Sequence, residues 1–509
     1  MSHQSSSAQG EIEKRDSQKL RRGTLGVLGI AFFVVSAAAP LTAMAGGAPV
    51  AMLYGNGAGI PAAYVVVSVL LLIFSVGYTT MARHHTSTGA FYSYITRGLK
   101  QPTGGASAII AVLGYNCMSI GLYGLFGAAA AGFASDHLGI DMAWYVYVFI
   151  AMAIVGLCGY RQVDLSVKVL VVLVTLEFLI VLILDLMILV KGGEGGKSGI
   201  SLSPFSWDSF TSGSITIALL FNFAAFIGFE ATTLYSEEAK DPKRTVPRAT
   251  YVAVLTIGLF YTVTTWLMVN GQGAVGLQDF LGGLKPDPTA FLFVLGDTYM
   301  GSSLTTLMSL LFVSSVFAAL LAFHNAVARY LFALGREGLV PSVLGRTHPK
   351  HQSPHVGSLA QTTLAFVVVL VFVLADKDPV LELFTWLTNL GTLAILVLMS
   401  LSSFAVIAFF AANRGLDSNL WRTVIAPAIG GIGMGLVAVY AAAKFGLLLG
   451  NPESSLRWIL PALIVVAAVV GLGAALRLKS VAPQMYAQMG RNRSDDGTAV
   501  GERPTEAVG

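Results

Sequence analysis

The sequence predicts an all-α integral membrane protein with about twelve transmembrane helices, and three observations indicate this class. Hydrophobic residues make up 55% of the 509-residue chain and charged residues only 11%, far from the balance of a water-soluble domain. Apolar runs recur along most of the chain, and each is long enough to supply the roughly 20 residues that a helix needs to cross the hydrocarbon. The loops between these runs also alternate in their content of basic residues.

Twelve apolar runs, each bounded by charged or turn residues, mark the expected spans. In chain order they cover residues 24–48, 60–82, 104–134, 141–160, 165–190, 212–236, 248–270, 301–334, 357–375, 380–411, 423–448 and 457–478. Runs of this length are unlike the roughly ten-residue alternating strands of an outer-membrane barrel, and a helix pairs every backbone group within its own segment. We therefore expect helices throughout and no large soluble domain.

Basic residues are distributed between the loops as the positive-inside rule requires. Loops that a cytoplasmic amino terminus would place inside are rich in Lys and Arg, and one of them carries Lys240, Lys243, Arg244 and Arg248. The loops assigned outside are poorer, with Lys191, Lys197, Lys285, Lys377 and Arg457. An even number of spans then predicts a multi-pass protein of the inner (cytoplasmic) membrane with both termini in the cytoplasm.

The two ends of the chain are expected to be disordered cytoplasmic tails. Residues 1–22 and 481–509 are polar and contain almost no aromatic residues, so they bury too little surface to order themselves, whereas residues 23–480 should form the membrane domain. The amino-terminal basic residues and the apolar stretch from Thr24 imitate a cleavable signal peptide. We reject that interpretation because the stretch continues past the would-be cleavage site at Ala43-Met44-Ala45.

Several other classes of protein lack the residue patterns that they need. Basic residues are scattered between apolar runs, so the net charge of +4 predicts no nucleic-acid partner. Cys117 and Cys158 both fall inside apolar runs, where neither a disulfide framework nor a metal-ligand spacing can be recognised. The sequence has no P-loop pattern for ATP and no HExxH motif. We therefore expect no enzyme activity, no cofactor and no metal.

Two of the expected spans contain residues that interrupt helices. Span one carries Ser36-Ala37-Ala38-Ala39-Pro40, and span six carries Ile227-Gly228-Phe229-Glu230. Proline removes a backbone donor and glycine loosens the backbone, so both helices should break within the membrane, although an ordinary proline kink would also explain span one. The two spans are five apart, which predicts an inverted repeat of five plus five helices with spans eleven and twelve as additions.

Glu230 places a carboxylate inside the apolar sixth span. A charge there costs about 2.5–3.5 kcal/mol on insertion scales, so the side chain should face protein or water, and it is a functional candidate. The alternative is that Glu230 caps a half-helix or lies near the cytoplasmic mouth.

Short motifs occur in or after spans two, six and eight. They are Gly89-Ala90-Phe91-Tyr92, Ala225-Phe226-Ile227-Gly228-Phe229-Glu230, Glu237-Glu238-Ala239-Lys240-Asp241-Pro242 and Gly335-Arg336-Glu337-Gly338. Together they resemble the amino acid–polyamine–organocation (APC) superfamily, and specifically its bacterial amino acid permeases, over about residues 22–480. The resemblance implies a LeuT-like fold and a secondary transporter that moves amino acids or related amines by alternating access.

The resemblance also implies a binding site. In this family the unwound parts of spans one and six hold the substrate through main-chain atoms, at positions that correspond here to Ser36, Ala37, Ala38, Ala225, Phe226, Ile227 and Gly228. Phe226 would be an aromatic gate, or else a core or lipid contact. Spans three, eight and ten line the family's side-chain pocket, which adds Asn116, His324 and Thr388 as candidates, although such polar residues also tie helices together.

Span five departs from the family. Its start, Leu165-Ser166-Val167-Lys168, resembles a segment that several proton-coupled members follow, eleven residues after the serine, with a buried lysine, whereas this chain has Glu177 there. A buried carboxylate can also carry a proton, so Glu177 joins Glu230 as a candidate for proton coupling. The alternatives are a Glu177 bonded to a neighbouring helix or facing the outer vestibule.

Three functional hypotheses remain open at this point. The first is a permease that couples uptake to protons by symport, the second is an exchanger without proton coupling, and the third is a membrane sensor that binds amino acids without moving them. The substrate is expected to be a neutral or cationic amino acid or an amine, because Glu177 and Glu230 are carboxylates and no Lys or Arg lies near a predicted midplane. The sequence carries no signal for the oligomeric state.

Overall fold

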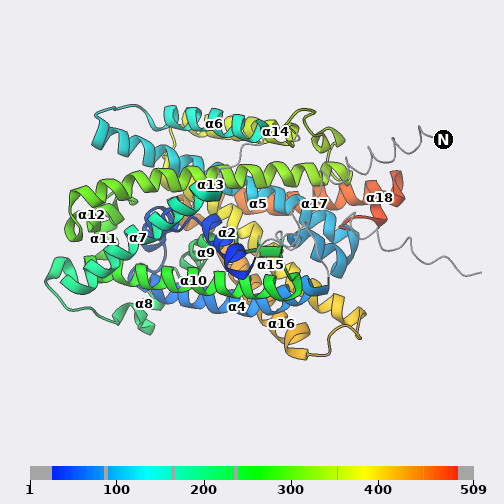
Figure 1. Cartoon of the computed structure of the whole chain (residues 1–509), viewed down its shortest axis with the longest axis horizontal. Coiled ribbons are helices and arrows are strands. Elements are labelled where there is room, and N and C mark those ends of the chain that lie inside the picture. The colour runs from blue at the N-terminus through cyan, green and yellow to red at the C-terminus, as the bar shows by residue number, and fades with distance from the viewer. Residues whose placement is uncertain are drawn as a thin grey trace, which may run out of the picture.

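The computed structural model describes residues 26–84, 90–161, 167–230, 232–233, 239–285, 287–351, 353–450 and 452–490. Within these residues the regular elements are helices, and the extended pairing is a single bridge between Gly193 and Ser198. Figure 1 shows the longer helices running side by side along the long axis of the molecule. The all-α prediction is confirmed.

Ten helices in the described part of the chain are long and apolar enough to cross a membrane. They comprise α4 (Ile60–His84), α5 (Ala90–Leu138), α6 (Trp144–Arg161), α7 (Val167–Lys191), α10 (Pro242–Gln272), α13 (Ser302–Arg336), α14 (His355–Leu374), α15 (Thr385–Ala412), α16 (Ala426–Ala443) and α17 (Leu456–Val481). These helices correspond to ten of the twelve expected spans. The chain is therefore a multi-pass membrane protein.

The first and sixth expected spans are interrupted in the structure. The first is divided into α2 (Val27–Ala37), the π-helical turn η1 (Thr42–Gly47) and α3 (Ala48–Tyr54), and the sixth contains α9 (Ile215–Phe226), which stops in mid-span. Neither interrupted span is counted among the ten long helices. The relation of the two halves by an inverted repeat stays a prediction.

Short elements lie at the two ends of the bundle. At one end lie α8 (Trp207–Thr211), α11 (Leu277–Gly283) and α12 (Ala290–Tyr299), and at the opposite end lies α18 (Pro483–Ala487) (Figure 1). Short 3-10 or π-helical segments lie between these helices or lead directly into them: η2 (Gly57–Gly59), η3 (Glu194–Gly196), η4 (Ser203–Phe205), η6 (Ser342–Gly345), η7 (Pro379–Phe384), η8 (Trp421–Ile425) and η9 (Phe445–Leu449). Residues 1–22 and 491–509 of the expected tails lie outside the described residues, whereas residues 481–490 include α18.

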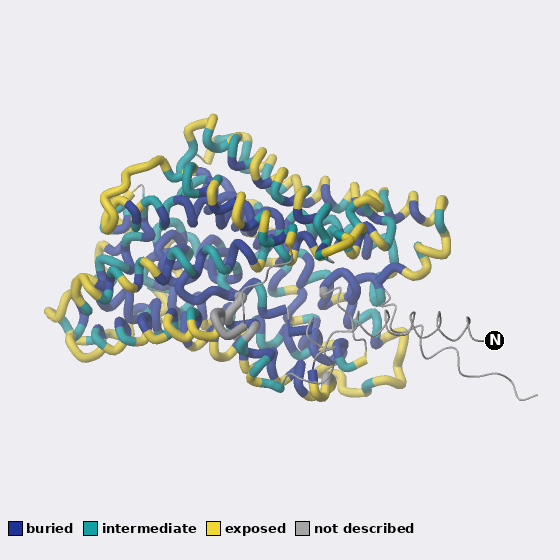
Figure 2. The backbone as a smooth tube through the Cα atoms, turned by 45° about the horizontal axis from the view of Figure 1, so that its top comes forward, coloured by how far each residue is buried: buried dark blue, intermediate teal, exposed yellow. Residues whose placement is uncertain are grey.

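The helices α5 and α15 pack closely at the centre of the bundle, where buried residues are concentrated (Figure 2). Small residues permit this approach, since a Cβ added at Gly391 would lie 2.7 Å from the carbonyl oxygen of Gly114. The outward faces of α7, α14, α16 and α17 expose large apolar side chains, such as Leu182, Val371, Val439 and Val466. Such faces suit lipid and would not suit water.

The substitution Gly391→Val tests this packing. A valine at that position would have to push α15 away from the backbone of α5, and overpacking of this kind costs about 1–3 kcal/mol. We expect a lower midpoint of thermal unfolding for the detergent-solubilised protein. Gly473→Val is the control, because a Cβ there meets no atom within 4 Å. Equal midpoints for the two variants would contradict the close contact.

Candidate functional site

The break in span one lies at Ala38 and Ala39. The Ala38 N–H makes the last bond of α2, to the carbonyl of Val34, and Ala39 then takes a φ of 44°, a left-handed conformation that residues with a Cβ seldom adopt. Pro40 follows. Proline suits the first position of the next helical segment, because the N–H that it lacks would have no partner within the helix there. The side chains of Ser36 and Ala37 lie outside the described part of the structure.

The break in span six lies at Ile227 and Gly228. Ile227 leaves the helix with a ψ of 127°, and Gly228 has a φ of 119°, which glycine tolerates and L side chains rarely adopt. The freed N–H of Gly228 donates to Oε2 of Glu230 over 2.8 Å. The other carboxylate oxygen of Glu230 accepts from the hydroxyl of Tyr115 on α5, also at 2.8 Å. Glu230 therefore acts as an acceptor at the break and ties it to α5.

Tyr261 on α10 connects the two breaks. Its hydroxyl oxygen lies 3.3 Å from the carbonyl oxygen of Ala38 and 3.3 Å from that of Ala225. A single O–H can point at only one of them at a time, so the arrangement leaves acceptor capacity for a ligand. Sequence reasoning missed Tyr261, because an aromatic residue in an apolar run has an ordinary packing explanation. The available signal was that a buried tyrosine hydroxyl needs a polar partner.

Phe226 lies against this junction. Its ring centroid is 6.4 Å from that of Tyr64 and 5.7 Å from that of Tyr261, and the side chain is almost fully buried. A small, mostly apolar cavity adjoins it, with a lining that includes Leu71, Ile227, Glu230, Thr392 and Met399. Phe226 is thus placed beside the break, as a gate would be, although a core contact would have the same surroundings.

The side chain of Glu177, on α7 in span five, contacts the start of the second half of span one. Its Oε2 accepts from the hydroxyl of Ser315 on α13 at 2.8 Å, and the Leu41 N–H bonds to the same carboxylate. The Ser315 hydroxyl lies 2.9 Å from that of Thr42 in η1. Because Ser315 donates to Glu177, Thr42 is the donor in this second bond. Glu177 thus bonds to neighbouring helices, and the chain of groups connects spans one, five and eight.

The three remaining candidates bond to other partners. The Nε2 atom of His324 lies 2.8 Å from the hydroxyl of Ser358 on α14. The Thr388 hydroxyl and the Asn116 amide each donate to a carbonyl one turn earlier in their own helices. None of these hydrogen bonds connects one of the three side chains to either break. The side-chain amide oxygen of Asn116, Oδ1, has no hydrogen-bond partner in the described structure.

A larger cavity, of about 500 Å³, opens at the end of the bundle where η7 and α15 begin. Its lining includes Trp144, Asp287, Asp376, Lys377 and Asp378. These residues lie at ends that the basic-loop pattern assigns to the outside, so the cavity is a candidate outer vestibule. Within the described residues, no group of His, Cys, Asp or Glu side chains is arranged to hold a metal ion.

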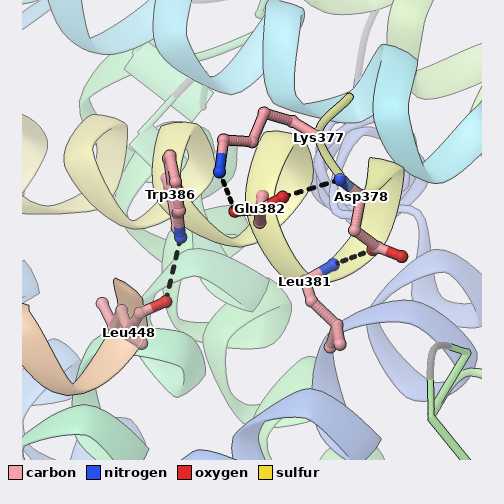
Figure 3. A network of polar contacts seen from close by, with 6 residues as sticks. All are labelled: Lys377, Asp378, Leu381, Glu382, Trp386 and Leu448. Carbon is pink, nitrogen blue, oxygen red and sulfur yellow. Dashed lines mark hydrogen bonds and ion pairs between the residues drawn. The ribbon is translucent and has the colours of Figure 1, made fainter. Parts of the chain in front are cut away.

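A polar network stiffens one wall of this vestibule (Figure 3). The Lys377 ammonium lies 2.8 Å from Oε1 of Glu382, and the other oxygen of Glu382 accepts from the Asp378 N–H at 2.8 Å. The Asp378 carboxylate accepts from the N–H groups of Val380 and Leu381 and so caps η7. Burial raises the pKa of the Asp378 carboxyl, and these N–H groups oppose that rise.

The comparisons with known proteins agree with this architecture. The family model described as "Amino acid permease" matches residues 25–470, which include both breaks. The chain is 24% identical to the low-affinity putrescine importer PlaP of Escherichia coli K12 over 71% of this chain and 74% of the relative. It is 24% identical to the branched-chain amino acid permease BcaP of Bacillus subtilis over 75% of this chain and 77% of the relative.

A third relative is the probable GABA permease of Pseudomonas aeruginosa, which is 24% identical over 73% of this chain and 74% of the relative. The family match extends over most of the chain, and the two interrupted helices lie within it. The chain therefore belongs to the amino acid permease family of the APC superfamily.

Proposed function

We propose that this protein is a secondary transporter that moves amino acids or related amines across the cytoplasmic membrane by alternating access. The observation that carries the proposal is the junction at which the Tyr261 hydroxyl meets the carbonyls of Ala38 and Ala225. Interrupted helices that meet in mid-membrane expose backbone groups that can hold a ligand's charged ends. The relatives whose names specify putrescine, branched-chain amino acids and GABA support the amino acid or amine class.

The ligand's ammonium would bind at the carbonyl oxygens of the two breaks. A charged ammonium is a stronger hydrogen-bond donor than a neutral phenol, so it can displace the Tyr261 hydroxyl from one carbonyl or share it. The ligand's carboxylate would bind main-chain N–H groups at the starts of the second half-helices, where the helix dipole favours a negative charge. In the structure, two of those N–H groups bond to carboxylates. The Leu41 N–H bonds to Glu177, and the Gly228 N–H bonds to Glu230.

The finer part of the proposal is that Glu177 couples transport to a proton. Its donors come from two other spans, namely the Leu41 N–H in span one and the Ser315 hydroxyl in span eight. If span one moves relative to span eight during alternating access, the carboxylate loses donors that stabilise its charge. A proton would then bind in one conformation and leave in the other. The second half of span one would carry this change directly to the binding site.

The rival hypotheses use the same binding site and differ in the step after substrate binds. An exchanger would move substrate only against a counter-substrate, and a sensor would bind substrate without moving it. Uptake of labelled amino acids and putrescine into proteoliposomes separates the three. Uptake driven by a proton gradient into vesicles without internal substrate supports the proton-coupled permease. Uptake that needs internal substrate indicates the exchanger, and binding without uptake indicates the sensor.

The first prediction for this site concerns Gly228→Leu. Leucine cannot easily adopt a φ of 119°, so the backbone at the break should change and the N–H bond to Glu230 should be lost. We expect substrate binding to be abolished while the protein remains inserted and monodisperse in detergent. Gly473→Leu on α17 is the matched control and should bind as the wild type does. Normal affinity in Gly228→Leu would place the binding site elsewhere.

The second prediction concerns substrate charge. Because Glu177 and Glu230 are buried carboxylates close to the two breaks, a second carboxylate on the substrate would lack a cationic partner. We expect glutamate to compete for uptake more weakly than leucine or lysine by about tenfold or more, which corresponds to about 1.4 kcal/mol. Preferential transport of glutamate or aspartate would count directly against this arrangement.

The third prediction concerns Glu177→Gln, which imitates the protonated carboxyl permanently. Such a protein should still bind and exchange substrate but should lose accumulation driven by a pH gradient. Asp185→Asn is the control, because Asp185 is a buried carboxylate on the same helix that bonds to Thr264 on α10. If Glu177→Gln concentrates substrate as the wild type does, then Glu177 has a structural role and Glu230 becomes the residue to test.

A further inference from the structure

The segment that comes after α17 is docked against the rest of the protein. This docked segment (residues 483–490) contains α18 and the turn after it. The Ser93 hydroxyl donates to the Gly490 carbonyl at 3.0 Å, and the Gly490 N–H lies 3.5 Å from Oε2 of Glu337. The Tyr92 hydroxyl donates to that same carboxylate oxygen. One carboxylate at the end of α13 thus holds both the docked segment and the start of α5.

Apolar contacts accompany these hydrogen bonds. Met489 is 2% exposed and belongs to a buried cluster with Tyr92, Leu334, Leu339 and Leu478. Gly490 has a φ of 68°, and a Cβ there would lie 3.0 Å from Cβ of Thr96. The neighbouring Ala487 is exposed and so marks the outer side of the same segment. A buried methionine and a glycine required by close approach indicate a specific contact.

The docked segment contacts an element that also packs beneath the break in span six. Lys100, with a φ of 71° and a ψ of 169°, interrupts α5 and separates a short helix (residues 90–99) from the span itself. On one face of this short helix, Phe91 and Tyr94 pack on Tyr78 of α4, with ring centroids 5.6 and 5.1 Å away. The Tyr78 hydroxyl in turn lies 3.3 Å from the Glu230 carbonyl oxygen.

The opposite face of the short helix carries Tyr92, Ser93 and Thr96, which contact the docked segment and Glu337. The short helix is therefore held from two sides, by α4 and the span-six break on one and by the docked segment with Glu337 on the other. Its side of the bundle is the side that the basic loops assign to the cytoplasm. The short helix thus contacts the span-six break through Tyr78 on that side of the bundle.

We infer that the docked segment is an autoinhibitory clasp, which holds the short helix against the end of α13 and keeps the cytoplasmic side of the span-six break covered. The inference rests on the proposed transport function. Opening towards the cytoplasm moves the short helix about Lys100 and breaks its bonds to Gly490 and Glu337. Release of the docked segment removes the bond from Ser93 to Gly490 in advance, so that only the Tyr92–Glu337 bond remains to be broken and opening becomes easier.

The variant Met489→Asp tests the clasp, because it places a charge in the buried cluster and should undock the segment. We expect the initial rate of uptake into proteoliposomes to rise severalfold, with substrate affinity unchanged. Ala487→Asp, a charge on the exposed side of the same segment, is the matched control and should transport at the wild-type rate. Ser93→Ala removes one hydrogen bond without a buried charge, so it should raise the rate to a smaller extent.

A second measurement reports docking without depending on transport. In a Cys117→Ser, Cys158→Ser background, Met489→Cys should react slowly with a maleimide, and adding Ser93→Ala should speed the reaction. If the wild type transports, and Ser93→Ala speeds the labelling of Met489→Cys but neither Ser93→Ala nor Met489→Asp speeds uptake, the clasp alone is overturned. If the wild type and both variants transport nothing, the proposed function fails and the inhibitory role fails with it.

Discussion

Backbone groups that are freed at two helix breaks in the membrane need hydrogen-bond partners, and the packing around spans one and six supplies them. Lipid supplies no hydrogen bonds, so each freed N–H and carbonyl must find a partner in the protein or in a ligand. Two carboxylates serve as acceptors, Glu177 for the Leu41 N–H and Glu230 for the Gly228 N–H. The Tyr261 hydroxyl serves the carbonyls of both breaks. The same groups that hold the two breaks together are therefore the ones that a zwitterionic ligand would replace.

Much of the fold could be predicted because membrane helices carry their signal locally. The lengths of the apolar runs identified ten spans, and Pro40 and Gly228 identified the two breaks. Each of these features acts on the backbone within a few residues of its own position. The extension of α5 before span three was not expected. Its first turns contain enough polar residues to hide them from a hydropathy argument, and they are covered by α4 on one face and by the docked segment on the opposite face.

The site was predicted less completely, because its contacts depend on which faces of distant helices meet. Tyr261, Ser315 and Thr42 lie far apart in the chain, and their hydroxyls look like ordinary residues of apolar runs until α10, α13 and η1 are placed together. His324 illustrates the opposite case, since its position in span eight suggested the pocket while its ring bonds to Ser358 on α14. Knowing the span of a residue does not identify the face on which its side chain lies.

We propose above that the ligand's ammonium binds between the two breaks. A cryo-electron microscopy structure with a bound amino acid or diamine tests it most directly. We expect ligand density within hydrogen-bonding distance of the Ala38 or Ala225 carbonyl, with the Tyr261 hydroxyl moved from at least one of them. Ligand density confined to the outer vestibule beside Asp376 and Asp378, with the Tyr261 bonds intact, would contradict it.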